Sequence, residues 1–403
     1  MRIRSITVFH HPRWPISELA LQKAGIFAQH ARETFEKAGY EVQTIRLATP
    51  SWHSFVGPED YAQLVATLGF LAHAEGFEYV SLGPATPDKL ETYTAIPEML
   101  PKSSNIFFNG HLTTPEGQIS LPAVRACAEV IHRTAPIEKN GFANLRFAAL
   151  ANVPPWAPFF PAAYHMGKTP AFALALEAAD LAVDAFGNAP SLAEARSSLI
   201  NAIQGHATLL EEKSNTLAAM YKFEFKGLDF TLAPFPGKTA SIGTALENLG
   251  LSAFGLPGSL AASAFLTDTL DRVSFKRTGF NGLMLPLLED STLAQRGAEG
   301  VLTLTDLLLY SSVCGTGLDT LPLPGDASVD QLQAVLLDLA ALGLRLNKPL
   351  TARLLPIPGK KAGDPTGFDF EYFANSKVLE MPARPLSGLF TGDESLEIKP
   401  RKQ

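Results

Sequence analysis

Hydrophobic and polar residues follow two different periods along the first 150 residues of the chain. Short β-branched or aromatic runs predict strands near residues 3–9, 41–47, 77–82, 104–110 and 145–150. Longer stretches with helical spacing predict helices near residues 16–38, 58–74 and 119–137. Strands that alternate with helices are typical of βαβ units, so we expect a largely parallel sheet with helices on its outside.

Prolines then interrupt the alternation at residues 154, 155, 158 and 161. Because proline fixes φ and lacks a backbone donor, this stretch predicts an ordered but irregular loop. After it, helical patterns dominate. Ser191 and Glu194 have the spacing of a capping box and open a helix that reaches about Lys222, while Ser328 and Gln331 open another over 329–346.

Shorter elements complete the second half of the chain. The pattern predicts further strands near residues 228–232, 280–285, 310–313 and 350–356, and further helices near 241–250, 258–271 and 302–309. We find no internal repeat, low-complexity tract or obvious linker. The sequence therefore predicts one compact α/β domain over residues 1–403, with a loose tail from Thr391 to Gln403.

Charge and composition exclude several classes of protein. The 33 basic and 40 acidic residues give a formal net charge of −7, and no long Lys/Arg run supplies the electrostatic footprint of a nucleic-acid binder. The apolar stretch Ala334 to Leu346 is broken by Asp338 and Arg345, and it is shorter than the ~20 residues that a membrane span needs. We expect neither nucleic acid nor membrane as a partner.

The two cysteines, Cys127 and Cys314, provide neither a disulfide framework nor a four-cysteine metal site. The apolar segment after Met1 is too short for an export signal, because histidines follow at positions 10 and 11. Both observations favour a cytoplasmic protein in a reducing compartment. A homo-oligomer is the usual prior for soluble assemblies.

Several segments of unusual composition carry a resemblance to a known family. They are residues 154–165, 232–236, 279–286, 310–326 and 348–353. In this order they resemble the uncharacterised PFL family (domain-of-unknown-function family 711), named for a barrel similar to that of pyruvate formate-lyase. The resemblance covers about residues 151–380, and residues 1–150 match loosely. It implies a closed ten-stranded α/β barrel like that of glycyl radical enzymes, with helices outside and no established activity.

Glycyl radical enzymes carry their radical on a C-terminal loop with an Arg-Val-x-Gly-Tyr-like motif. The corresponding end of this chain, 388–393, reads Gly-Leu-Phe-Thr-Gly-Asp and lacks it. The segment 277–280 is faintly similar but lies in the middle of the chain. We therefore expect no glycyl radical.

Cys314 is the leading candidate for a catalytic nucleophile. It follows the predicted strand 310–313 and precedes Gly315 and Gly317, whose freedom at positive φ allows a tight turn that presents the thiol. A reactive thiolate needs a nearby base or cation, for which His165 and Arg353 are candidates. A small buried core cysteine explains the same residue equally well.

Histidines follow most of the predicted strands, at positions 10, 11, 53, 111 and 165. The carboxyl ends of parallel strands gather on one face, where ligands usually bind, so these side chains could surround one pocket. His165 is assigned a catalytic role because it also lies in a family segment. The alternative for each histidine is a solvated loop position.

Carboxylates form a second candidate group. Asp319 and Asp326 bracket a proline-rich run, and Glu289 and Asp290 follow the predicted strand 280–285. Oxygen ligands of this kind suit Mg²⁺ or Ca²⁺, so Asp290, Asp319 and Asp326 are assigned as metal ligands, and Asp319 is assigned a catalytic role too. Helix caps and turns are the alternative.

Four further residues are assigned to substrate binding. Lys348 and Arg353 flank the start of a late strand, and Arg353 could hold an anion through two parallel hydrogen bonds. A structural ion pair of Arg353 with Asp319 or Glu247 explains it as well. Ser241 begins a helix whose amino end could hold a phosphate or carboxylate, and Asn281 lies in the segment 279–286.

Three functions remain open at this point. The first is an enzyme that binds a small anionic metabolite in the barrel near Cys314, without radical chemistry. The second is an enzyme that depends on a divalent metal held by carboxylates and histidines. The third is a noncatalytic metabolite-binding or regulatory protein that kept the barrel.

Overall fold

The computed structural model describes residues 1–313 and 315–400, and its main feature is a nine-stranded mixed sheet. The strands are β1 (Arg2–Phe9), β2 (Ile45–Ser51), β3 (Tyr79–Gly83), β4 (Ile106–His111), β6 (Phe147–Ala151), β7 (Ala171–Glu177), β8 (Glu224–Ala233), β9 (Gly317–Pro324) and β10 (Leu350–Ile357). Their order is β8-β7-β1-β2-β3-β4-β6-β10-β9. A small second sheet pairs β5 (Ile119–Ser120) with β11 (Ser395–Leu396).

The central strands, from β1 to β6 in this order, run parallel. β7 is antiparallel to β1, and β8 is parallel to β7. At the other side β10 is antiparallel to β6, and β9 is parallel to β10. The first half of the chain therefore forms the parallel sheet that the sequence predicts, and the second half adds a reversed pair of strands at each side.

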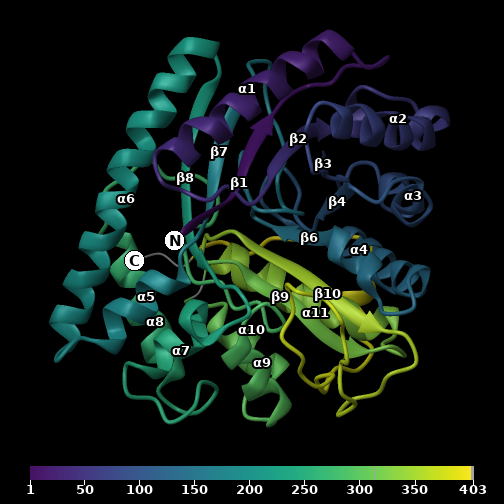
Figure 1. Cartoon of the computed structure of the whole chain (residues 1–403). Helices are drawn as coiled ribbons and strands as arrows, with labels where there is room; N and C mark the ends of the chain where they lie inside the picture. The colour runs from purple at the N-terminus through teal and green to yellow at the C-terminus, as the bar shows by residue number, and fades with distance from the viewer. Residues whose placement is uncertain (314, 401–403) are drawn as a thin grey trace.

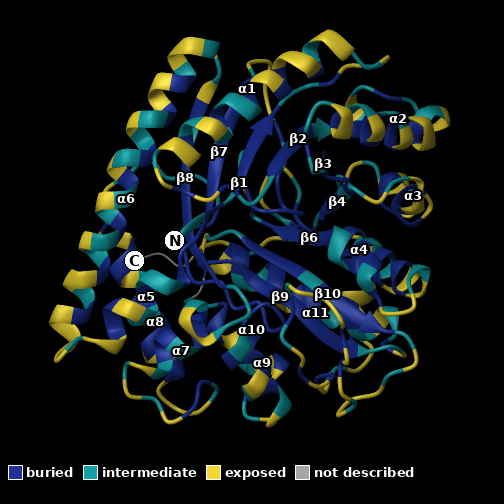
Figure 2. Cartoon of the chain, in the orientation of Figure 1, coloured by how far each residue is buried: buried dark blue, intermediate teal, exposed yellow. Residues whose placement is uncertain are grey.

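Helices surround the sheet (Figure 1). They are α1 (Glu18–Lys37), α2 (Tyr61–Ala74), α3 (Glu91–Met99), α4 (Leu121–Thr134), α5 (Ala179–Gly187), α6 (Leu192–Tyr221), α7 (Ile242–Glu247), α8 (Ser259–Asp271), α9 (Ser291–Ala298), α10 (Leu304–Tyr310) and α11 (Val329–Arg345). The strands are buried almost throughout, whereas the helices carry exposed residues on their outward sides (Figure 2). No helix in the described part of the chain is long and apolar enough to cross a membrane.

Most predicted elements are confirmed, and three expectations were wrong. Residues 280–285 are an irregular segment, and residues 310–313 are the end of α10 and a turn. The strand expected there begins later, at Gly317. β7 lies where only helices were expected, because its Ala-Phe-Ala-Leu-Ala-Leu-Glu sequence has the alanines that favour helices.

The sheet is open, with β8 and β9 at its edges. The irregular segment 277–286 reaches both edges through isolated parallel bridges, at Leu228 with Arg277 and at Asp319 with Pro286. A mixed α/β fold with outer helices is thus established. Closure into a ten-stranded barrel stays a prediction.

The proline-rich loop 153–165 lies against the inner face of the sheet, the face turned away from α1 to α4. Buried alanines of the strands, including Ala148, Ala173 and Ala175, leave room for it. Three strand side chains donate hydrogen bonds to its carbonyls: Thr7 to Pro158 (2.8 Å), Ser81 to Ala163 (2.7 Å) and Asn109 to Pro161 (2.6 Å). Because a buried carbonyl needs a donor, these polar residues fix the loop in place.

Candidate functional site

A cavity of about 160 Å³ opens on the inner face, at the amino ends of β2, β3 and β4. Its walls come from ten parts of the chain that are distant in sequence. The lining residues are Arg4, Gln43, Thr44, Arg46, Tyr79, Phe107, Leu145, Phe159, Phe160, Met284, Glu289, Asp319, Arg353, Phe370, Tyr372 and Phe373. Charged residues therefore share this cavity with many aromatic rings.

One wall of the cavity is a buried network of ion pairs. Arg353 donates from Nε to Oδ1 of Asp319 (2.6 Å) and from Nη2 to Oε1 of Glu289 (2.7 Å). Arg4 donates from Nη2 to the other oxygen of Glu289 (2.7 Å) and from Nη1 to Oε2 of Glu177 (3.2 Å). Arg4 and Arg353 are thereby each paired with two carboxylates.

The two carboxyl groups of this wall differ in acidity. Burial alone would raise the pKa of Glu289, but the charges of Arg353 and Arg4 hold it below its ordinary value. Burial raises the pKa of Asp319, and the charge of Glu289 adds to this effect while Arg353 opposes it. Two neighbouring acids whose pKa values move apart are a common arrangement in sites that transfer protons.

Arg46 differs from the other arginines of the cavity. It is 8% exposed, and its Nε donates to Oγ1 of Thr44 (2.8 Å). Within residues 1–313 and 315–400, its two terminal nitrogens have no hydrogen-bond partner and the side chain has no carboxylate partner. Burial lowers its pKa to about 9, and the charge of Arg4 adds to this effect.

Aromatic side chains form the remaining walls. The rings of Tyr79 and Phe107 have centroids 5.2 Å apart, and Phe107 and Phe160 have centroids 5.5 Å apart. The guanidinium of Arg46 lies 5.2 Å from the ring of Phe160 and 5.8 Å from that of Tyr79. These contacts orient the guanidinium through cation–π attraction without using its hydrogen-bond donors.

Cys314, the predicted nucleophile, lies outside the described residues. The described residue Gly315 contacts the irregular segment 277–286, because its backbone donates to the carbonyl of Leu283 (3.0 Å). A Cβ on Gly315 would lie 2.5 Å from the Cα of Gly282. Gly317 has φ of +97°, as expected for a glycine that makes a turn.

His165 lies at the opposite end of the strands from the cavity. Its backbone donates to the carbonyl of Thr49 (3.0 Å), near the carboxyl end of β2. The ring is buried, and neither nitrogen has a partner among the residues described. Burial lowers its pKa to about 4, and the nearby His10 and His11 contribute. The structure brings these three histidines together, as the sequence suggested, but not with Arg353.

The predicted metal ligands lie in three different places. Asp319 lies in the cavity wall, and Asp326 is exposed beyond the end of β9. Asp290 is fully buried and accepts hydrogen bonds from Ser241 (2.7 Å) and from backbone nitrogens that include Ile242 (2.6 Å) and Leu293 (3.0 Å). In the described part of the chain, no group of three or more His, Cys, Asp or Glu side chains is arranged to hold a metal ion.

The other predicted binding residues also lie away from the cavity. Ser241 is the N-cap of α7 and accepts from the backbone of Thr244 (3.0 Å). Asn281 accepts from the backbone of Phe230 (3.0 Å) and lines a separate surface depression. Lys348 is half-buried in the connection between α11 and β10. Of the four residues assigned to substrate binding, only Arg353 lines the cavity.

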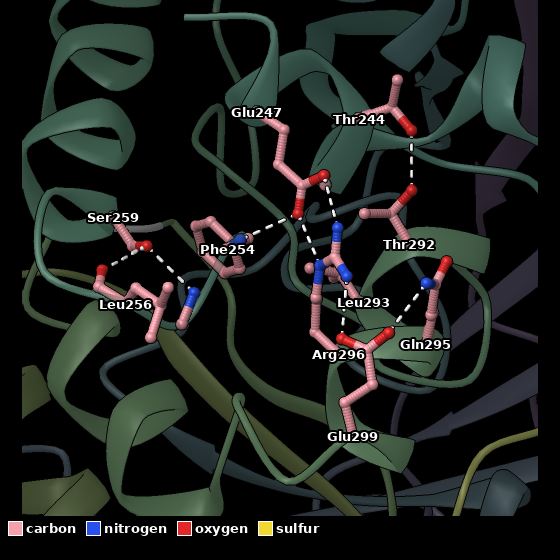
Figure 3. A network of polar contacts seen from close by, with 12 residues as sticks. Thr244, Glu247, Phe254, Leu256, Ser259, Thr292, Leu293, Gln295, Arg296 and Glu299 are labelled. Atoms are coloured by element: carbon pink, nitrogen blue, oxygen red, sulfur yellow. Dashed lines mark hydrogen bonds and ion pairs between the residues drawn. The ribbon is translucent and has the colours of Figure 1, made fainter. Parts of the chain in front are cut away.

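Glu247, the alternative partner considered for Arg353, belongs to another network (Figure 3). Both of its oxygens accept from Arg296, at 2.7 and 2.9 Å, and the same arginine also donates to Glu299 (2.7 Å). This network joins α7 to α9. Arg353 therefore takes Asp319 and Glu289 as its partners instead.

Sequence reasoning missed Arg4 and Arg46. Arg46 stands between Ile45 and Leu47 in a predicted strand, where the pattern otherwise indicates burial. An arginine inside such a strand is a signal in itself, because a buried guanidinium needs an acidic partner or a ligand. The sequence could not show which of these it has.

The chain matches known proteins over most of its length. Residues 1–373 match the family described as Uncharacterised ACR (DUF711). A UPF0210 protein of Pyrobaculum aerophilum is 36% identical over 256 residues, or 61% of this chain and just over half (56%) of the relative. A UPF0210 protein of Pyrobaculum arsenaticum is 30% identical over 355 residues, or 83% of this chain and 78% of the relative. One of Methanosarcina acetivorans is 28% identical over 81% of this chain and 73% of the relative.

The family match includes residues 1–150, where the sequence segments resembled the family only loosely. The names of these relatives state no activity. On the strength of the match over residues 1–373, the chain belongs to the uncharacterised DUF711 (UPF0210) family.

Proposed function

We propose that this protein is an enzyme that acts on a small organic anion, which it binds in the inner-face cavity. The observation that carries this proposal is Arg46. Its guanidinium borders the cavity with both terminal nitrogens free of partners in the described residues. Arg4 and Arg353, in the same cavity, are each paired with carboxylates.

An anionic ligand follows from the physics of a buried charge. Removing a guanidinium from water has a free-energy cost of several kcal/mol unless an opposite charge compensates it. The neighbouring positive charges of Arg4 and Arg353 increase this cost, and the lowered pKa of Arg46 reflects it. A carboxylate that binds the two terminal nitrogens would supply the missing charge through two parallel hydrogen bonds.

The acids of the ion-pair wall support a catalytic role. Asp319 and Glu289 border the same cavity as Arg46, so a bound anion would lie against groups that can exchange a proton. Asp319 is our candidate for that exchange because its pKa is raised while that of Glu289 is lowered. Cys314 keeps the catalytic role proposed from the sequence, whereas His165 lies at the opposite end of the strands and takes no part in chemistry at this cavity.

The barrel suggested by the family resemblance also belongs to this proposal. The segment 277–286 bridges to β8 at one end and to β9 at the other. This placement supports a barrel similar to that of pyruvate formate-lyase, in which the segment would take the place of the tenth strand. The cavity would then lie inside the barrel.

A noncatalytic metabolite-binding protein is the second candidate. All four carboxylate oxygens of Asp319 and Glu289 already accept hydrogen bonds from Arg353 or Arg4. A carboxylate held in this way is a weaker base than a free one, because each bond stabilises its charged form. This favours binding without chemistry.

Anion binding by wild type and two Arg46 variants tests the proposal. Isothermal titration with acetate, benzoate, oxalate and inorganic phosphate would identify which anion binds. We expect Arg46→Gln to weaken the binding of that anion about 10- to 100-fold, because the variant loses hydrogen bonds to a charged group. Arg46→Lys keeps the charge but loses the paired donors, so it should weaken binding less.

Arg272→Gln is the matched control, because this exposed arginine is the C-cap of α8 and pairs with Asp268 at the surface. It should bind anions as the wild type does. Circular dichroism and thermal unfolding would show that each variant is folded. The proposal fails if no anion binds to the wild type, or if a folded Arg46→Gln variant binds as tightly as the wild type.

A further inference from the structure

Resting on the proposed function, we infer that the ligand is a monocarboxylate with a compact apolar or aromatic body and no ammonium group. Three independent features of the cavity lead to this substrate class. They are the charge balance of its walls, the occupancy of its carboxylate oxygens, and the size and chemistry of the remaining space.

The charge balance indicates a single negative charge on the ligand. Among the described residues, the cavity is lined by three guanidiniums, of Arg4, Arg46 and Arg353, and by the two carboxylates of Glu289 and Asp319. One positive charge is left, and Arg46 is the member without an acidic partner. A dianion such as a phosphate monoester would bring a second charge that no free cation of these walls compensates.

The carboxylate oxygens argue against an amino acid. Both oxygens of Asp319 accept from Arg353, at 2.6 and 3.0 Å. The oxygens of Glu289 accept one from Arg353 and one from Arg4, each at 2.7 Å. An ammonium group in the cavity would therefore meet two guanidiniums and no unoccupied carboxylate oxygen, which is unfavourable in a buried site.

The remaining walls fit an apolar body. Tyr79, Phe107, Phe159, Phe160, Phe370, Tyr372 and Phe373 contribute aromatic rings, and Met284 and Leu145 contribute aliphatic surface. The volume of about 160 Å³ is close to that of an engineered cavity of about 150 Å³ that binds benzene. The cavity therefore accommodates a body of roughly six carbon atoms, and a planar ring can stack against Phe107 or Phe160.

The orientation of Arg46 places the expected carboxylate site next to the apolar walls. Its guanidinium lies near the rings of Phe160 and Tyr79, and Nε is held by Thr44. The free edge with the two terminal nitrogens borders the same space that the rings enclose. A carboxylate bound at this edge would therefore carry its apolar body among the aromatic side chains.

A matched set of small molecules tests the substrate class at pH 8, measured by isothermal titration with the full chain. Benzoate is the probe, benzamide removes its charge, acetate removes its ring, phenylphosphonate adds a charge, and phenylglycine inserts a carbon that carries an ammonium group. We expect benzoate to bind at least 10-fold more tightly than each of the other four. Arg46→Gln should remove this preference for benzoate over benzamide.

A variant of the wall gives a second readout. Phe107→Leu keeps an apolar side chain but removes the ring. It should therefore weaken the binding of benzoate several-fold and leave the binding of acetate unchanged. If oxalate or phosphate binds in an Arg46-dependent manner and benzoate does not, the substrate class is wrong and the proposed function stands. Phenylglycine or phenylphosphonate binding as tightly as benzoate also overturns the class. If no anion binds, both proposals fail.

Discussion

Arg353 and Asp319 lie side by side on neighbouring strands, and the guanidinium holds both carboxylate oxygens at 2.6 and 3.0 Å. The pairing of β10 with β9 is irregular at this point, between Ala352 and Leu354, and Thr320 has φ of +47°. The local distortion of the strands therefore accompanies the ion pair that forms one wall of the cavity. Strain of this kind in a non-glycine residue is often found at functional sites.

Removing Arg353 should destabilise the protein strongly. Arg353→Met would leave Asp319 buried without its cation and Glu289 with one cation instead of two. Breaking a buried pair on one side typically reduces the free energy of unfolding by about 3–5 kcal/mol. Urea unfolding monitored by circular dichroism measures this change.

The matched control for this prediction is Arg272→Met, since Arg272 makes an exposed ion pair with Asp268 on α8. Exposed pairs contribute about 1 kcal/mol or less. If Arg353→Met lowers the free energy of unfolding no more than the control does, the cavity wall tolerates the unpaired acids and the prediction is wrong.

Buried histidines should make the fold sensitive to acid. Burial lowers the pKa of His10, His111 and His165 to about 4 in the native state. The unfolded chain binds protons near the ordinary value of about 6.5, so the native state binds fewer protons between pH 6.5 and 4. Stability from these groups is thus complete above about pH 6.5 and is lost as the pH falls towards 4.

Urea unfolding at pH 7.5 and pH 5 compares the two conditions. We expect a lower free energy of unfolding at pH 5, with up to three protons bound on unfolding through these residues. On unfolding, His165→Phe should take up about one proton fewer than the wild type. The variant lacks a ring whose nitrogens have no partner in the described structure. The same pH dependence in wild type and His165→Phe would contradict the assignment.

Replacement of Asp290 distinguishes its role as a helix cap from its predicted role as a metal ligand. Its carboxylate accepts from Thr292 and Leu293 in α9 and from Ile242 and Gly243 in α7. Loss of a cap costs about 0.5–2 kcal/mol per helix, so Asp290→Ala should destabilise the protein by about 2 kcal/mol or more.

Elemental analysis of purified Asp290→Ala protein gives the second readout. Asp330→Ala, in the exposed first turn of α11, serves as a control that should change stability by less than about 0.5 kcal/mol. If the wild type contains stoichiometric divalent metal and Asp290→Ala loses it, the metal-dependent hypothesis gains and the capping explanation is incomplete.

Thiol labelling distinguishes the two cysteines. Cys127 is fully buried in α4, its Sγ lies 3.7 Å from the carbonyl of Gly110, and burial raises its pKa. Native Cys314→Ala protein should therefore show no reactive thiol, and one should appear on unfolding. Ellman's reagent measures both states.

Cys127→Ala is the complementary variant, and it isolates the thiol of Cys314. Labelling of this variant in the native state would support the nucleophile role. A native protein in which Cys314 does not react would instead favour the reading of this residue as an inert core cysteine. Rapid labelling of native Cys314→Ala would contradict the burial of Cys127.

Local patterns predicted the helices well. The capping residues Ser191 and Ser328 begin α6 and α11 as expected, because the spacing of a cap depends on neighbouring residues alone. Long-range effects explain the failures. β7 is rich in alanine, which suits a strand here only because the loop 153–165 lies against it. The segment 280–285 is strand-like in sequence, but the printed β-bridges to the two sheet edges are made by its flanking residues Arg277 and Pro286.

For the candidate site, too, the sequence indicated residues but not where they lie relative to one another. From the sequence, Asp319 could be named only as one of two possible partners of Arg353, with Glu247 as the other. His165 and the carboxylates could be named too, but not their separation to opposite ends of the strands. The type of a residue determines which chemistry it can perform, whereas its distance from other residues depends on the order of the strands.

The sequence by itself determined an α/β protein of mostly parallel strands, most of its longer helices and its family, because these depend on periodicity, capping and long matching segments. Only the tertiary structure decided that Arg46, isolated in its strand, meets Arg4 and Arg353 around one cavity. It also decided that these two donate to all four carboxylate oxygens of Glu289 and Asp319. A side chain acquires its partners from strand order and register, which here join Arg4 to Glu289, 285 positions away.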